Sequence, residues 1–201
     1  MIDLTYNKRN RRCNLENREE IIEKNRNLYN QEQISFIAQN CIGGVIYHDM
    51  NKKFLSPTIN LYFSASDFIK FVNNLEYYLS LDINITNNDP ITAELDDIKL
   101  YFLHYNSEEE AIQKWEERKK RIIKDKIFVI CTDRDGFDDE CMEKFKNIKL
   151  PKALITCNEK WKKYPFVIYL EQYKNLTQVP DTIPTREFYN GTQLIKLINE
   201  V

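Results

Sequence analysis

Short apolar runs rich in strand-forming residues alternate with segments of helical periodicity along this chain of 201 residues. Between two such runs, residues 66–79 have apolar side chains at spacings of three and four, which is typical of an amphipathic helix. Strands that alternate with helices favour an α/β fold. We therefore expect a largely parallel sheet flanked by helices, in a Rossmann-like three-layer arrangement. The expected strands are residues 34–38, 59–63, 81–85, 98–105, 127–131, 153–157 and 166–170.

Helix-start and break signals separate these runs. Ser107 and Glu110 form a Ser-x-x-Glu capping box, in which each side chain satisfies a backbone donor at the start of a helix. Residues 87–90, Asn-Asn-Asp-Pro, form a strong break. The pattern predicts a charged N-terminal helix within residues 1–30 and a single α/β domain over residues 31–201. The other expected helices are residues 45–50, 66–79, 107–122, 138–148 and 192–201.

Charge and cysteine content narrow the class of protein. The 29 basic and 31 acidic side chains nearly balance. Because a nucleic-acid-binding domain is normally clearly basic, this balance argues against a dedicated nucleic-acid-binding protein. No run approaches the roughly 18 apolar residues that a membrane span needs. No apolar segment follows the basic residues near the N-terminus, so we expect a cytoplasmic protein. The five cysteines include no Cys-x-x-Cys pair, which leaves zinc-ribbon and thioredoxin sites without their basic spacing.

Three loops follow expected strands, at the edge of the sheet where open α/β folds bind ligands: residues 39–44, 104–107 and 132–136. The first contains Gly43 and Gly44, two of only four glycines in the chain. Adjacent glycines indicate a tight turn or a close backbone approach to a ligand. If a helix begins there, its free amides, with Asn40 beside them, can hold an anion or an oxyanion.

Cys41 directly precedes these glycines, and a thiol at a helix N-terminus can become a nucleophile. A nucleophilic thiol needs a base, and His104 ends an expected strand, so the two side chains can share a cleft. Asp133 or Asp135, which follow another strand, can orient the imidazole. A buried structural cysteine and a hydrogen-bonded loop histidine explain the same residues without chemistry.

Asp133 and Asp135 also form an Asp-x-Asp pattern, which many nucleotide-sugar glycosyltransferases use to hold a divalent cation on a diphosphate. Two carboxylates beside a phosphate suit Mg²⁺ or Mn²⁺. An Asp-Gly turn before a helix explains the pattern equally well, and Asp-x-Asp often occurs by chance in a chain with 31 acidic residues. The sequence therefore assigns no metal site and no cofactor.

Six motifs occur in a fixed order along the chain: residues 40–47, 56–58, 67–71, 103–105, 115–118 and 133–136. Together they resemble a bacterial family of domains of unknown function, whose members are often labelled exopolysaccharide biosynthesis proteins and sometimes acyltransferases. The resemblance covers about residues 30–170 and departs from the family at Ile42, where we expect Trp. It implies an α/β protein linked to surface-glycan assembly, with no assigned cofactor, and it groups Asn40, Cys41, Gly43, Gly44, His104 and Asp133.

Three hypotheses remain open at this point. The first is a cytoplasmic protein that modifies a glycan or its precursor by acyl transfer, with Cys41 as nucleophile, His104 as base and the Gly43 and Gly44 amides as oxyanion donors. The second is metal-dependent sugar transfer through Asp133 and Asp135. The third is a non-catalytic binding or scaffold protein of a glycan-assembly system. The sequence leaves the oligomeric state open.

Overall fold

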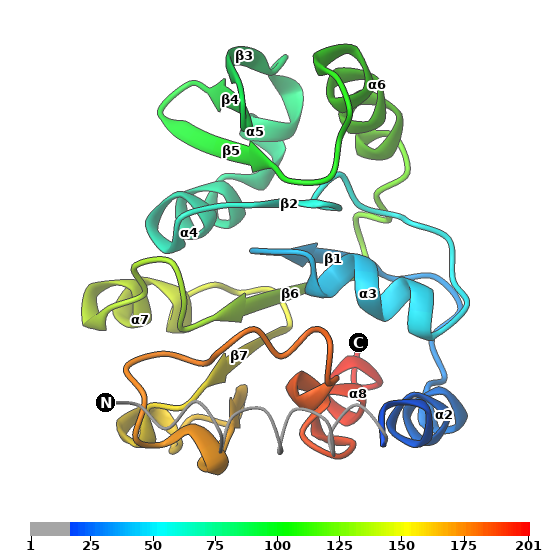
Figure 1. Cartoon of the computed structure of the whole chain (residues 1–201), viewed down its shortest axis with the longest axis vertical. Helices are drawn as coiled ribbons and strands as arrows, with labels where there is room; N and C mark the ends of the chain where they lie inside the picture. Colours follow the sequence, from blue (N-terminus) through cyan, green and yellow to red (C-terminus); the bar gives the residue numbers. More distant parts are fainter. Residues whose placement is uncertain (1–16) are drawn as a thin grey trace.

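The computed structural model describes residues 17–201, in which eight strands form two separate sheets (Figure 1). The first sheet is wholly parallel and has the order β1-β6-β7-β8. Its strands are β1 (Ser35–Ala38), β6 (Ile127–Thr132), β7 (Lys152–Thr156) and β8 (Val167–Tyr169). The second sheet is antiparallel, with the order β2-β5-β4-β3. Its strands are β2 (Leu61–Tyr62), β3 (Asn84–Asn88), β4 (Ile91–Leu95) and β5 (Ile98–Phe102).

The parallel sheet agrees with the predicted α/β class, but half of the strands in the described residues lie outside it. The expected largely parallel, Rossmann-like three-layer arrangement is therefore not confirmed. The difference arises at the break in residues 87–90, which joins β3 to β4 as a tight hairpin. So short a connection permits only antiparallel pairing, because parallel neighbours need a crossover of a dozen or more residues.

The helices of residues 17–201 are α2 (Arg18–Leu28), α3 (Ile42–Asp49), α4 (Ala65–Asn73), α5 (Leu75–Ser80), α6 (Glu108–Lys119), α7 (Asp139–Lys146) and α8 (Gln193–Ile198). Helix α3 contacts β1 and α8 contacts β7 of the parallel sheet, whereas α4 contacts both β6 and the antiparallel strand β5. Single 3-10 turns lie at η1 (Glu159–Trp161), η2 (Glu171–Tyr173) and η3 (Glu187–Tyr189). Helix α2 lies within residues 1–30, where a charged N-terminal helix is expected, and residues 1–16 of that range lie outside the described residues. No helix among residues 17–201 combines the length and apolar character needed to traverse a bilayer.

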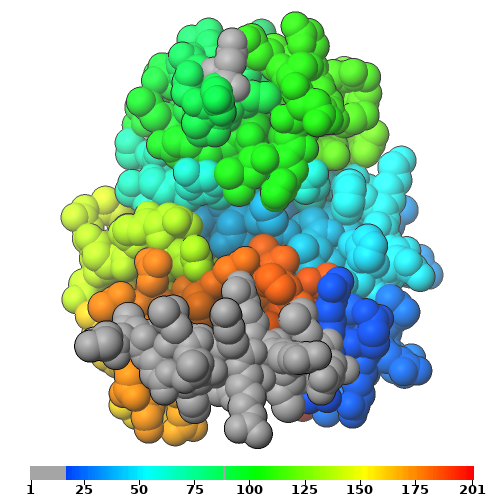
Figure 2. Space-filling view, in the orientation of Figure 1, coloured from blue at the N-terminus to red at the C-terminus, as the bar shows by residue number. Residues whose placement is uncertain are grey.

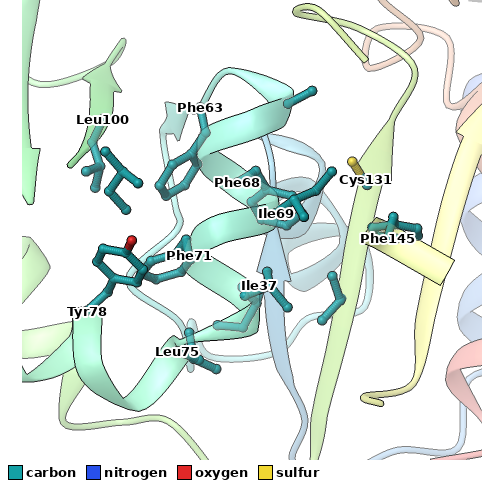
Figure 3. Close-up of a cluster of buried hydrophobic side chains, with 14 of the residues drawn as sticks. Ile37, Phe63, Phe68, Ile69, Phe71, Leu75, Tyr78, Leu100, Cys131 and Phe145 are labelled. Carbon is teal, nitrogen blue, oxygen red and sulfur yellow. The ribbon is translucent and has the colours of Figure 1, made fainter. Parts of the chain in front are cut away.

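The alternating side chains of β1 and β6 divide the core into two clusters. Phe36 and Phe128 point into a cluster with α3, η3 and α8. Ile37 and Cys131 point into a second cluster, which is shared with α4, α7 and the antiparallel sheet. In Figure 3 the aromatic side chains of α4 lie between these strands and Leu100 of β5. Helix α4 therefore joins the two sheets through a continuous apolar layer.

Local capping explains where several helices begin. Ser107 Oγ accepts a hydrogen bond from the Glu110 amide at 3.2 Å, as the capping box predicts. The Glu110 carboxylate reaches one residue further back than expected and accepts from the Asn106 amide at 2.9 Å. Asp138 caps α7 in the same way, because its carboxylate accepts from the Cys141 amide at 2.8 Å. The predicted helix over residues 66–79 is divided at Asn74 into α4 and α5.

Candidate functional site

A cavity of about 640 Å³ lies at the carboxyl ends of β1 and β6, beside the junction of the two sheets. In Figure 2 residues near 103 (green) and near 180 (orange) face each other across this region. Each of the three loops expected to meet at this edge contributes to the wall, and the segment 180–183 closes it. The lining residues are Asn40, Cys41, Ile42, Gly44, Val45, His48, Phe54, Asn60, Tyr62, Leu103, His104, Thr132, Arg134, Asp135, Pro180, Asp181, Thr182 and Ile183.

Gln39, which directly follows β1, links the segments that meet at the base of the cavity. Its buried Oε1 accepts hydrogen bonds from the Thr132 amide and hydroxyl, both at 2.9 Å, and its Nε2 donates to the Arg134 carbonyl at 3.2 Å. Its backbone carbonyl accepts from the Phe63 amide at 3.0 Å, just beyond β2. The Gln39 side chain thus joins the end of β1 to the end of β6, and the Gln39 backbone joins both to the antiparallel sheet.

Asn40 and Cys41 lead from β1 into α3. Asn40 Oδ1 accepts from the Ile42 amide at 3.1 Å, and Asn40 Nδ2 donates to Thr132 Oγ1 at 3.3 Å. Asn40 lines the cavity, but these bonds already engage both ends of its amide. Cys41 occupies the N-cap position of α3, and its side chain is partly exposed in the cavity wall.

The two adjacent glycines lie in the first turn of α3 and do not form a tight turn before it. A Cβ atom on Gly43 would lie 2.9 Å from the Ala38 Cβ of β1, so only glycine lets the helix lie this close to the strand. Gly44 lines the cavity, whereas Gly43 faces β1 and is absent from the lining. The clustering of glycine reflects helix–strand packing.

Cys41 and His104, predicted as nucleophile and base, line the same cavity although they come from different sheets. His104 is exposed at the rim. Burial, with the nearby negative charge of Asp181, raises the pKa of the Cys41 thiol to about 11. The thiol is therefore protonated at neutral pH, and it needs a base before it can act as a nucleophile.

Asp133, the predicted third member, points away from this pair. Its buried carboxylate accepts from the Thr156 hydroxyl and the Val179 amide, both at 2.7 Å, and from the Cys157 amide at 2.9 Å. Asp133 is absent from the cavity lining, and these contacts tie β6 to β7 and to the C-terminal segment.

Asp135, by contrast, lines the cavity, and partial burial raises the pKa of its carboxyl. Because Asp133 is engaged elsewhere, the two carboxylates of the Asp-x-Asp pattern do not converge on one point. Across residues 17–201, no group of three or more His, Cys, Asp or Glu side chains is arranged to hold a metal ion.

Several lining residues lay outside the sequence prediction. Arg134 occupies the middle of the Asp-x-Asp pattern, and no carboxylate oxygen of the described chain lies within 4.0 Å of its guanidinium. Tyr62, half-buried, stacks on Tyr101 with ring centroids 4.6 Å apart. Asp181 belongs to an irregular segment that follows no strand, so no periodic signal marks it.

Comparison with known proteins gives a family for this architecture. Residues 10–201 match the family described as "Domain of unknown function (DUF1919)". A protein of Haemophilus influenzae, named "Uncharacterized protein", is 29% identical over 182 residues, which cover 87% of each chain. Neither description mentions exopolysaccharide or acyl transfer. The matched span includes both sheets and every cavity residue, and the chain belongs to the DUF1919 family.

Proposed function

We propose that the cavity binds a glycan or a glycan precursor, and that the protein takes part in exopolysaccharide biosynthesis. The observation that supports this most strongly is the composition of the wall. Amide, hydroxyl, guanidinium and carboxylate groups line it together with the aromatic rings of Phe54 and Tyr62. Sugar hydroxyls both donate and accept hydrogen bonds, so they suit such a mixture of groups. The apolar face of a sugar ring packs on an aromatic ring.

The size and position of the cavity also support this proposal. Its volume of about 640 Å³ falls inside the range of roughly 300–1,000 Å³ that is usual for small-molecule sites. It opens at the carboxyl edge of the parallel sheet, where α/β folds bind ligands. The proposal keeps the cytoplasmic compartment expected from the sequence, where a thiol such as Cys41 stays reduced.

Binding is tested by calorimetry with free hexoses, N-acetylhexosamines, hexose phosphates and nucleotide sugars as probes. We expect at least one probe to bind, and we expect Asp135→Asn or Tyr62→Ala to weaken that binding about tenfold or more, because the first removes a charged acceptor and the second an aromatic ring from the wall. Asp125→Asn and Tyr77→Ala are matched controls outside the cavity and should leave the affinity unchanged. If no probe class binds, or if the controls weaken binding as much as the wall variants, the proposal fails.

Acyl transfer onto the bound glycan is a second candidate function, favoured by the shared cavity of Cys41 and His104. In this reaction the Cys41 sulfur attacks the acyl carbonyl, and the thiol proton passes to the imidazole. The bond between the acyl group and the donor's leaving group breaks, the imidazolium returns the proton to that leaving group, and the sulfur keeps the acyl group as a thioester. The imidazole then accepts the proton of a sugar hydroxyl as its oxygen takes the acyl group, and this proton returns to the Cys41 sulfur. A pKa of about 11 makes this proton transfer the difficult part of the step.

The reactivity of Cys41 with iodoacetamide between pH 6 and pH 10 tests this second candidate. An unassisted thiol with a pKa of about 11 should react about tenfold faster for each pH unit up to that value. If His104 accepts the proton, the wild-type rate should rise less steeply with pH than this, and His104→Ala should restore the steep rise. His48→Ala, at another position of the same wall, is the control. Identical steep profiles in all three proteins would exclude His104 as the base.

A further inference from the structure

The C-terminal wall of the cavity, residues 180–183, has no regular secondary structure and is held at each end by side chains from elsewhere. We call this segment the arch. At its start, the Val179 amide donates to Asp133 Oδ1 at 2.7 Å, and Arg134 Nη1 donates to the Val179 carbonyl at 3.1 Å. Both partners follow β6, so this end of the arch is fixed to the parallel sheet.

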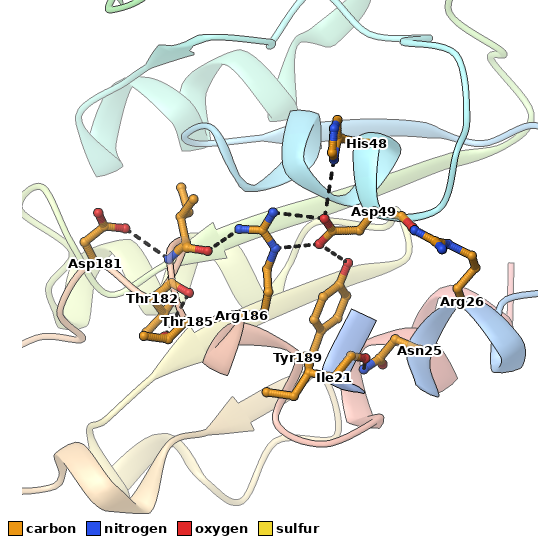
Figure 4. Close-up of polar contacts among 11 residues, drawn as sticks. Ile21, Asn25, Arg26, His48, Asp49, Asp181, Thr182, Thr185, Arg186 and Tyr189 are labelled. Carbon is orange, nitrogen blue, oxygen red and sulfur yellow. Dashed lines mark hydrogen bonds and ion pairs between the residues drawn. The ribbon is translucent and has the colours of Figure 1, made fainter. Parts of the chain in front are cut away.

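The other end of the arch is joined to α3 by a buried ion pair (Figure 4). Arg186 Nη1 donates to the Ile183 carbonyl. The same guanidinium donates through Nε to Asp49 Oδ2 at 2.6 Å and through Nη2 to Asp49 Oδ1 at 2.9 Å. The Tyr189 hydroxyl also donates to Asp49, at 3.1 Å. The side chains of Arg186 and Asp49 are only 5% and 0% exposed, so solvent hardly screens this pair.

The backbone of Arg186 has an unfavourable conformation that the surrounding contacts must hold in place. Arg186 has φ of 61°, in the left-handed region. For a residue with a Cβ that conformation costs roughly 1 kcal/mol or more, and it persists where surrounding contacts fix it. Asp49 ends α3, and Cys41 lies at the N-cap of the same helix. The ion pair therefore couples the arch to the helix that forms the opposite wall.

We propose that Asp49 and Arg186 are positioning residues that hold the arch against α3 and so set the width of the cavity and the exposure of Cys41. This inference rests on the proposed function, because it takes the cavity as the ligand site. A buried ion pair is weak evidence for stability by itself, since the cost of desolvation offsets much of the attraction. The bidentate geometry instead fixes one arrangement of two segments.

Site-resolved alkylation tests the coupling without any ligand. Iodoacetamide is added at pH 8 to the full chain, and modification of each cysteine is followed by mass spectrometry. In Asp49→Asn the arch should move away from α3. The thiol of Cys41 then loses both the burial and the Asp181 charge that raise its pKa. We expect Cys41 to react about tenfold faster, since each unit of pKa lowered raises the thiolate fraction about tenfold.

The chain supplies its own controls. Cys131 and Cys141 are buried in the other core cluster, away from the arch, and their reaction rates should not change. Arg186→Lys keeps the charge but lacks the planar fork, so it should give a smaller acceleration confined to Cys41. Asp97→Asn breaks the exposed ion pair with Lys70 and should change nothing.

Acceleration of all the buried cysteines together would show that the pair only stabilises the fold, and the inference would be wrong. If Asp49→Asn does not fold, Arg186→Lys decides alone, and an unchanged Cys41 rate in that variant overturns the inference. Failure of the proposed function has a different signature: no sugar probe binds, while Cys41 still responds to Asp49→Asn.

Discussion

Asp133→Ala is expected to lower the free energy of unfolding by about 3 kcal/mol or more. The substitution leaves the Thr156 hydroxyl and the Cys157 and Val179 amides without the acceptor that they share in the wild type. Each buried donor without a partner costs roughly 1–3 kcal/mol. Because these donors come from β7 and from the segment before the arch, their loss weakens two contacts of β6 at once. Urea unfolding followed by circular dichroism measures the change.

Asp135→Ala is the matched control for this experiment. Asp135 is two residues away and half-buried, and its carboxylate makes no hydrogen bond within residues 17–201. Its substitution should change the free energy of unfolding by less than about 1 kcal/mol. Comparable stability of the two variants would contradict the structural role of Asp133. A folded Asp133→Asn protein that loses sugar binding, with unchanged stability, would restore Asp133 to the candidate site.

Gly43→Val is expected to destabilise the chain by about 3 kcal/mol, with Gly43→Ala intermediate. The new Cβ would lie 2.9 Å from the Ala38 Cβ, and both atoms are attached directly to backbone, so α3 or β1 must shift. The better helix propensity of alanine offsets up to about 1 kcal/mol of this cost. Chemical denaturation measures the effect, and because α3 forms a wall of the cavity, sugar affinity should fall as well.

Gly44 offers a control within the same helical turn. A Cβ on Gly44 would meet the Ile59 Cγ2 at 3.3 Å, which is the end of a side chain that can adjust. Gly44→Ala should therefore leave stability nearly unchanged, because the gain in helix propensity offsets the small crowding. The double variant Gly43→Ala, Ala38→Gly should recover most of the lost stability. A destabilised Gly44→Ala beside an unaffected Gly43→Ala would refute this account of the glycine pair.

The sequence predicted the parallel strands well because their signal is continuous. Residues 127–131 and 153–157 are almost wholly apolar, as expected for strands buried on both faces. Strand β4, Ile91–Leu95, alternates apolar and polar residues as a half-buried strand does, but it was missed because it follows directly on the break at Asp89-Pro90. That single omission turned an antiparallel sheet into an expected continuation of the parallel one.

The candidate site was predicted in part for a similar reason. The rule that ligands bind at the carboxyl edge of a sheet selected the loops containing Cys41, His104 and Asp135, and all three line the cavity. The same rule selected Asp133, but a backbone position at the edge does not determine which way a side chain points. The arch was missed because its place depends on contacts such as that between Asp133 and Val179, which no local pattern reveals.

Strands β1 and β6 are direct neighbours, with Ala38 paired to Ile130, and the whole antiparallel sheet is inserted in the chain between them. The part of the cavity rim that contains His104 thus belongs to an insertion that begins after β1 and ends before the adjacent strand β6. Closing a longer insertion costs little, about 0.6 kcal/mol for each doubling of its length. The loops of this insertion that line the cavity, such as the one that carries His104, can therefore change in length while β1 and β6 keep their pairing and their shared core with α4. Relatives that differ in these loops can then bind different ligands in the cavity while they keep the same parallel sheet.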